Sequence, residues 1–168
     1  MSQIPQAKYL KDYQSPDFLI PTTELFFTLD DHQTLVRSKL KVIRNGEHEC
    51  SLILDSKVDK LLSIKIDGEL ISNFTEKNEQ LIIDVESNDF CLEIESISDP
   101  ANNTALEGLY KSAGVYCTQC EAEGFRKITP YLDRPDVLSK FTVTIFTQED
   151  NNVHVLANGN LIDSGVID

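Results

Sequence analysis

The sequence contains few positive charges for its size. Its 168 residues include 15 Lys and Arg against 28 Asp and Glu, which gives a formal net charge of -13. A protein this acidic repels phosphate backbones and anionic lipid surfaces, and we therefore expect no nucleic acid and no membrane among its partners. The negative electrostatic field of the protein favours a cationic ligand, although an acidic surface is most often simply solvated and keeps a protein soluble.

Long apolar runs are also missing. No run approaches the roughly 20 residues that a helix needs to span a bilayer, and residues 1–8 lack the hydrophobic core of a signal peptide. The sequence therefore predicts a cytoplasmic protein. Its length lies within the range of one domain and allows a self-sufficient core.

Cysteine is scarce. The four cysteines are too few and too unevenly spaced for a disulfide framework, and we expect reduced thiols. Cys117-Thr-Gln-Cys120 has the spacing of a redox pair or of half a structural zinc site. A structural zinc needs four ligands, however, and Cys50 and Cys91 are not paired at such a spacing. A thioredoxin-like pair would begin a helix between strands, which this turn-rich stretch does not supply. We interpret the pair as ordinary packed thiols.

The chain does contain many short runs in which apolar and polar residues alternate. This period of two is typical of half-buried strands, and β-branched, aromatic and leucine residues dominate the runs. Helical periodicity is hard to sustain over three turns anywhere in the chain. The predicted strands are Leu25–Leu29, Leu35–Ile43, Leu61–Ile66, Leu81–Val85, Phe90–Ile94 and Phe141–Phe146.

Three dipeptides predict tight turns. Asn45-Gly46, Asp67-Gly68 and Asn158-Gly159 each place a residue that tolerates positive φ before a glycine, which is the signature of a two-residue hairpin. The last one predicts a hairpin between Val153–Ala157 and Leu161–Ile167, whose second arm stops with no closing element. We therefore predict an all-β fold, either an antiparallel β-sandwich or a curved, saddle-like sheet, with little helix.

Residues 96–135 break the alternation and contain the motif Cys117-Thr-Gln-Cys-Glu-Ala-Glu-Gly-Phe-Arg126. If the motif is extended, Gln119, Glu121 and Glu123 share one face. An amide and two carboxylates suit a primary ammonium, because that group has hydrogen-bond donors and no acceptor. A long irregular segment on a β scaffold is a common way to present ligand-binding groups.

Three separated blocks of the sequence form a specific combination. They are Asn103–Tyr110, Cys117–Arg126 and Tyr131–Val137. In this order they resemble the amino-terminal domain of bacterial zinc aminopeptidase N, and the opening stretches Pro5–Tyr9, Asp12-Tyr13 and Pro16-Asp17 are similar to the start of the same enzymes. The resemblance covers nearly the whole chain, which makes it far more specific than a lone short motif.

This resemblance implies that residues 1–168 form a single amino-terminal β-domain of a larger multidomain aminopeptidase, truncated near the carboxyl end of the domain. The catalytic domain, with its zinc, would follow in the same chain. The full-length protein would then be a metallo-aminopeptidase, a hydrolase that releases amino-terminal residues from peptides. Its partners would be the amino terminus of a peptide substrate and its own catalytic domain.

The zinc motif of such enzymes is absent from the sequence. It requires His-Glu-x-x-His on a helix, so that two imidazoles reach one metal and the glutamate activates water. His48-Glu49 is the nearest match, but Leu52 occupies the position of the second histidine, and His32 and His154 are isolated. We therefore expect no catalytic residue, no metal ligand and no bound zinc in this fragment, which alone should be inactive.

The resemblance also implies roles for residues of the motif. Gln119 and Glu121 match positions that line the first substrate subsite, where the glutamate accepts the free amino terminus of the peptide. Such a charge-assisted hydrogen bond contributes about 1.5–3 kcal/mol. We interpret Glu123 as structural, Arg126 as a residue that could orient one of the carboxylates, and Asp133–Asp136 as a local salt-bridged turn.

Two alternatives from other classes stay open. One is a free-standing β-sandwich module that binds a cationic ligand, a carbohydrate or another protein. The other is a redox or metal protein built on Cys117 and Cys120. The sequence indicates neither the preferred amino-terminal side chain of a substrate nor the oligomeric state.

Overall fold

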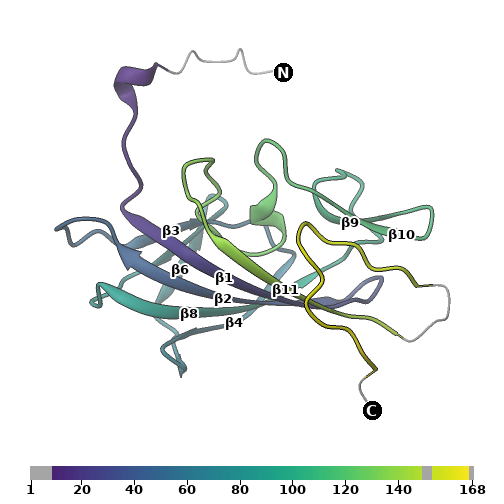
Figure 1. Cartoon of the computed structure of the whole chain (residues 1–168). Helices are drawn as coiled ribbons and strands as arrows, with labels where there is room; N and C mark the ends of the chain where they lie inside the picture. The colour runs from purple at the N-terminus through teal and green to yellow at the C-terminus, as the bar shows by residue number, and fades with distance from the viewer. Residues whose placement is uncertain (1–8, 149–152, 167–168) are drawn as a thin grey trace.

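The computed structural model describes residues 9–148 and 153–166, and this part of the chain is built from strands (Figure 1). The largest sheet has six strands in the order β11-β1-β2-β8-β4-β5. Its neighbouring strands are antiparallel, except that β1 and β11 are parallel. The strands are β1 (Phe18–Thr28), β2 (Thr34–Arg44), β4 (Lys60–Ile66), β5 (Glu69–Leu70), β8 (Asp89–Ser98) and β11 (Lys140–Phe146).

Two smaller units accompany this sheet. One is an antiparallel sheet in the order β3-β7-β6, and the other is the hairpin formed by β9 and β10. The strands are β3 (Leu52–Asp55), β6 (Phe74–Lys77), β7 (Gln80–Ile83), β9 (Gly108–Ser112) and β10 (Val115–Gln119). The helical elements in the described residues are the 3-10 turns η1 (Leu10–Asp12) and η2 (Phe125–Lys127), and no described helix has the length and apolar character needed to cross a membrane.

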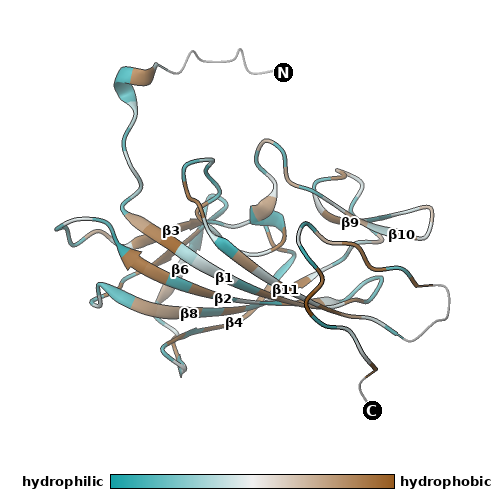
Figure 2. Cartoon of the chain, viewed as in Figure 1, coloured by the Kyte–Doolittle hydropathy of each residue, from teal (hydrophilic) through white to brown (hydrophobic). Residues whose placement is uncertain are grey.

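Two hydrophobic clusters cover the inner face of the six-stranded sheet. In the larger cluster, Leu40 of β2 and Leu92 of β8 pack with Leu54 of β3 and Ile83 of β7, and all four side chains are fully buried. The smaller cluster, near the β9–β10 hairpin, is made of Leu25, Phe27, Val36, Leu109 and Ile128. The strand surfaces in Figure 2 alternate between hydrophobic and hydrophilic residues, as a sheet with one buried face requires.

Buried hydroxyl groups link the segment before β11 to the sheet between these clusters. The Ser38 and Thr129 hydroxyls are 2.7 Å apart, and the Thr23 hydroxyl lies 2.8 Å from that of Ser139 and 3.3 Å from that of Tyr131. Thr23, Ser38 and Thr129 are almost completely buried. Because a buried hydroxyl without a partner is costly, these pairs fix where the segment lies on the sheet.

The predictions of an all-β fold and of the six alternating strands are confirmed. Strand β1 begins seven residues before the predicted Leu25, because Pro21 obscures the alternation. The pairing of β1 with β2 is irregular between Leu19 and Thr22, and Pro21 lies in this bulge. A bulge is one of the few places where a strand accepts proline, which has no N–H for the ladder.

The turn predictions had a mixed outcome. Asp67-Gly68 does form the two-residue hairpin between β4 and β5, with positive φ at both residues. Asn45-Gly46 does not form one, since the chain there leaves the large sheet for β3. Asn78-Glu79 and Ala113-Gly114 are two-residue turns with positive φ that the sequence analysis missed.

The predicted hairpin around Asn158-Gly159 is wrong for its described part. The backbone bends there, but no described residue of Val153–Val166 is in a strand. Leu156 and Leu161 are 93% and 82% exposed, so the segment has no surface on which to bury its apolar side. An isolated two-stranded hairpin is at best marginally stable in water, which explains the difference.

The shared core of the two sheets leads to a prediction about stability. Leu54→Ala removes a side chain that joins β3 to the large sheet, and we expect it to lower the free energy of unfolding by about 2–5 kcal/mol. The neighbouring Ile53 is 46% exposed, and Ile53→Ala should cost less than about 1 kcal/mol. Urea denaturation of both variants measures the difference, and equal losses would contradict the shared core.

Candidate functional site

The motif Cys117–Arg126 lies where the β9–β10 hairpin returns to the sheet. Strand β10 ends at Gln119, residues 121–124 form a turn, and η2 follows at once. The expectation of an extended motif, with Gln119, Glu121 and Glu123 on one face, is wrong beyond Gln119. The chain must reverse there because Phe125 and Ile128, on the far side of the turn, pack into the two hydrophobic clusters.

Two glycines allow the hairpin and η2 to approach closely. A Cβ atom on Gly124 would lie 2.9 Å from the carbonyl oxygen of Gln119 and from the Cα of Cys120. A Cβ atom on Gly108 would lie 2.6 Å from the Cβ of Lys127, and the φ angle of Gly108, +71°, also favours glycine. The turn is therefore folded back tightly against the end of β10.

Of the two predicted substrate-binding residues, Gln119 is the last residue of β10 and Glu121 is the first residue of the turn, and both are exposed. Among residues 9–148 and 153–166, neither side chain makes a hydrogen bond or an ion pair. The amide and the carboxylate are two residues apart in the sequence, and the structure leaves both open to solvent. A group with hydrogen-bond donors and positive charge could bind there.

Arg126 is the main polar anchor of the turn, and its side chain is only 17% exposed. Its Nε donates to Asp133 Oδ2 at 2.7 Å, its Nη1 lies 3.5 Å from Asp55 Oδ1, and its Nη2 lies 3.2 Å from Glu123 Oε2. The backbone carbonyl of Arg126 also accepts a hydrogen bond from the N–H of Lys57. Arg126 thus contacts one carboxylate of the motif, that of Glu123, and its role in orienting a carboxylate stays a prediction.

The environment of Arg126 shifts both its own pKa and that of Asp55. Burial raises the pKa of Asp55 above its ordinary value, against the opposing effect of the Arg126 charge. Burial also disfavours the charged form of Arg126, but the hydrogen bond with Asp133 and the charge of Asp55 outweigh it and raise the Arg126 pKa. Arg126 therefore stays charged and partly desolvated among carboxylates, where ion pairs are stronger than at an open surface.

A second polar cluster fixes the hairpin itself. Asp31, in the turn after β1, accepts hydrogen bonds of 2.5 Å from Lys111 of β9 and from the hydroxyl of Tyr116 of β10. The hydrogen bonds from Lys111 and Tyr116 lower the pKa of Asp31, whereas burial and the Asp31 contact raise the pKa of Tyr116 to about 12. The strand that leads to Gln119 is therefore tied to the large sheet at its far end.

The segment after η2 contains the predicted salt-bridged turn. Arg134 pairs with Asp136 at 2.7 Å and donates to the backbone carbonyl of Gln14, which confirms the prediction. Asp133 is not part of this pair but binds Arg126.

Three of the four thiols are partly buried, and Cys50 is exposed. All four cysteines are free. Cys120 packs against the smaller hydrophobic cluster, and burial raises the pKa of its thiol to about 11. Across the described ranges, no group of three His, Cys, Asp or Glu side chains could hold a metal ion.

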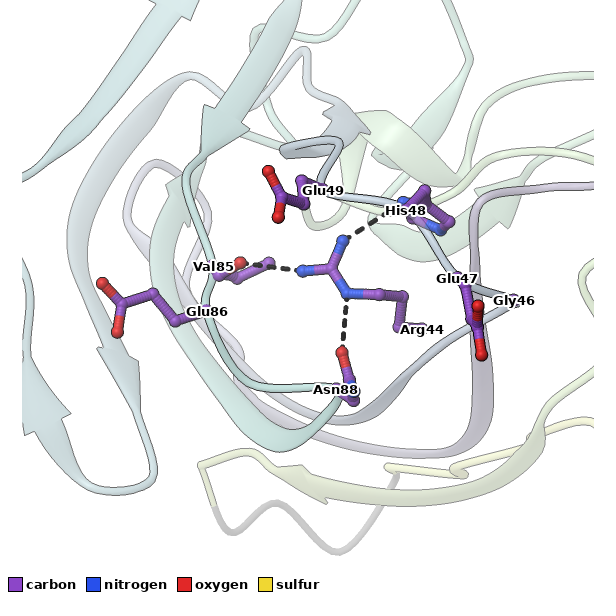
Figure 3. A pocket seen from close by; sticks show the side chains of 8 residues that line it. All are labelled: Arg44, Gly46, Glu47, His48, Glu49, Val85, Glu86 and Asn88. Atoms are coloured by element: carbon purple, nitrogen blue, oxygen red, sulfur yellow. Dashed lines mark hydrogen bonds between the residues drawn. The ribbon is translucent and has the colours of Figure 1, made fainter.

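A hollow of about 740 Å³ at the other end of β2 is a second candidate site (Figure 3). At its centre the buried Arg44 donates to Asn88 Oδ1 and to the backbone carbonyls of Cys50 and Val85, and it stacks on the Phe18 ring. The Arg44 guanidinium thus holds the two surrounding loops together. The hollow is a junction at which Arg44 joins the loop around Cys50 to the loop between Val85 and Asn88.

Residues 21–168 match the family model described as the Peptidase M1 N-terminal domain. The chain is an M1 peptidase N-terminal domain. Aminopeptidase N of Escherichia coli (strain K12) is 43% identical to it over 168 residues, and that of Caulobacter vibrioides is 44% identical over 166 residues. These matches cover 100% and 98% of the chain but 19% of each relative, so the chain spans about a fifth of their length.

Solved structures show the same fold. The chain resembles Legionella pneumophila aminopeptidase A in complex with aspartic acid at 30% identity and a TM-score of 0.74, over 82% of this chain and 17% of that one. An M1 zinc metallopeptidase from Deinococcus radiodurans has a TM-score of 0.67 at 15% identity, over 78% of this chain and 32% of that one. At that identity the likeness establishes the fold of the M1 domain alone.

Sequence reasoning identified the exposed residues of the turn but missed part of what holds it. Glu123 and Arg126 are three residues apart, and that spacing is a local signal of a pair. Asp55 has no local signal, because it reaches Arg126 only through the pairing of β3 with the segment around Tyr131.

The tight turn of the M1 domain can be tested with glycine substitutions. Gly124→Ala places a methyl group against the Gln119 carbonyl, and we expect a loss of about 1–3 kcal/mol in the free energy of unfolding. Gly159→Ala is the matched control, since a Cβ atom there meets no atom within 4 Å. Denaturant unfolding compares the two variants, and an unchanged stability of Gly124→Ala would show that the turn is looser than described.

The state of the thiols gives a second test. At about pH 8, iodoacetamide should modify the exposed Cys50 well before Cys120, because the reactive thiolate is suppressed by burial and by the raised pKa of Cys120. Peptide mass spectrometry over a time course measures both rates, and the denatured chain is the control. Fast modification of Cys120, or a reversible disulfide between Cys117 and Cys120, would instead favour the redox alternative.

Proposed function

We propose that this M1 domain is the substrate-anchoring, amino-terminal part of a zinc-dependent aminopeptidase N that releases amino-terminal residues from peptides. The observation that carries the proposal is the likeness to aminopeptidase N, at 42–44% identity over nearly the whole chain. Glu121 is exposed on an anchored turn and has no ion-pair partner in the part of the chain that the structure describes, which supports the role of that residue.

The chemistry of the turn suits the amino terminus of a peptide. The Glu121 carboxylate accepts a hydrogen bond from the ammonium and pairs with its charge, while the Gln119 amide oxygen accepts a further hydrogen bond. An internal peptide nitrogen is neutral and cannot replace the ammonium. This difference in charge is the physical basis for selecting chain ends.

The chain's own residues do not fit a catalytic zinc. The sequence contains no His-Glu-x-x-His, and the described residues offer no cluster of three possible ligands. The zinc, which activates the attacking water in enzymes of this kind, therefore belongs to a catalytic domain elsewhere in the same polypeptide. The M1 domain alone is inactive under this proposal, and its contribution is to bind and orient the substrate.

The proposal predicts a specific effect of Glu121→Gln in the full-length protein. The substitution removes the charge that pairs with the ammonium, and we expect kcat/KM for short peptides to fall by about 10- to 100-fold. Steady-state kinetics with a dipeptide amide that has a free amino terminus measures the change.

Glu76→Gln is the matched control, because Glu76 is an exposed glutamate of β6 in the other sheet. It should leave the kinetics unchanged. Equal kcat/KM values for the wild type and Glu121→Gln would remove the assigned role of Glu121.

A further inference from the structure

The position of the Glu121 carboxylate depends on how the turn is attached on its two sides. On one side, Glu121 follows strand β10, which the Asp31 cluster ties to the large sheet. On the other side the turn leads directly into η2. The link between η2 and the rest of the fold therefore controls the second half of the turn.

Arg126 provides that link. Its guanidinium reaches Asp55 of β3 and Asp133 of the segment before β11, and both carboxylates lie in parts of the fold that do not belong to the turn. Asp55 is in turn bound to this segment, because its carboxylate accepts a hydrogen bond from the Asp133 N–H at 3.3 Å. One side chain thus joins η2 to two separate elements.

The geometry requires an arginine. Nε, Nη1 and Nη2 each face a different carboxylate, those of Asp133, Asp55 and Glu123. The planar, forked guanidinium can make these contacts in fixed directions, whereas the single ammonium of a lysine cannot. The side chains of Arg126 and Asp133 are only 17% and 11% exposed, so their pairing is stronger and more rigid than a surface ion pair.

We propose that Arg126, through Asp55 and Asp133, is a positioning residue that holds Glu121 at the place where it meets the substrate ammonium. The inference rests on the proposed function of Glu121. Arg126 itself does not touch the substrate, because its donors are directed at the three carboxylates of its own domain. Its loss lets η2 and the turn shift, and the anchoring charge shifts with them.

The test is a double-mutant cycle in the full-length protein, with Arg126→Met and Arg126→Lys each combined with Glu121→Gln. We expect each Arg126 variant alone to lower kcat/KM for a dipeptide amide by about 5- to 50-fold, and by less than about 3-fold in the Glu121→Gln background. Thermal unfolding of every variant is recorded alongside. A residue that only stabilises the fold would cause the same relative loss in both backgrounds.

Two further variants sharpen the experiment. Asp55→Asn weakens the contact between Arg126 and β3 without changing the turn. It should lower kcat/KM by less than the Arg126 variants do, and this effect should also disappear in the Glu121→Gln background. Arg134→Met is the matched control, since Arg134 is a nearby arginine that pairs with Asp136 instead. It should leave kcat/KM within about 2-fold of the wild type.

Each outcome decides a different question. If an Arg126 variant lowers kcat/KM by the same factor with and without Glu121→Gln, the positioning role of Arg126 is overturned and the proposed function is left intact. No effect of Glu121→Gln by itself would overturn both. If Arg126→Met does not fold, the double-mutant cycles that combine Arg126→Lys or Asp55→Asn with Glu121→Gln test the same proposal.

Discussion

The inner face of the six-stranded sheet has to be kept from water, and this constraint shapes the rest of the domain. The β3-β7-β6 sheet covers one half through side chains such as Leu54 and Ile83. The other half, around Leu25 and Val36, is covered by the β9–β10 hairpin and η2. Because Phe125 and Ile128 must reach this surface, the chain has to reverse directly after β10. The exposed turn with Glu121 is a consequence of that reversal.

The charges around the turn are distributed unequally. Arg126 is surrounded by Asp55, Asp133 and Glu123, so three carboxylates already occupy its donors. The partly buried Arg126 is therefore unavailable to Glu121. Of the two glutamates in the turn, one secures the backbone and the other has no ion-pair partner among the described residues. This division supports a binding role for Glu121 more strongly than the net charge of the chain does, since a uniformly acidic surface needs no such arrangement.

The alternation of apolar residues predicted most of the large sheet, because one buried face imposes a period of two on β2 and β8 at its centre. It failed where backbone geometry departs from the regular ladder, as at Pro21, and where a glycine-free turn such as Asn78-Glu79 adopts positive φ. For the site, the family motif indicated Gln119 and Glu121. The contact between Asp55 and Arg126 depends on tertiary packing, which no local pattern records.

An anchor of this kind is useful only if it is rigid. A carboxylate that moves by about an ångström relative to the reacting bond no longer holds the substrate in the reactive geometry. The rate advantage of a positioned substrate is then largely lost, because it depends on a preorganised site. The exposed turn has little apolar surface with which to fix itself. Its rigidity comes from the close contact at Gly124, from the Asp31 cluster and from the partly buried Arg126. On the proposed function, the domain therefore contributes to catalysis by supporting one carboxylate from three directions.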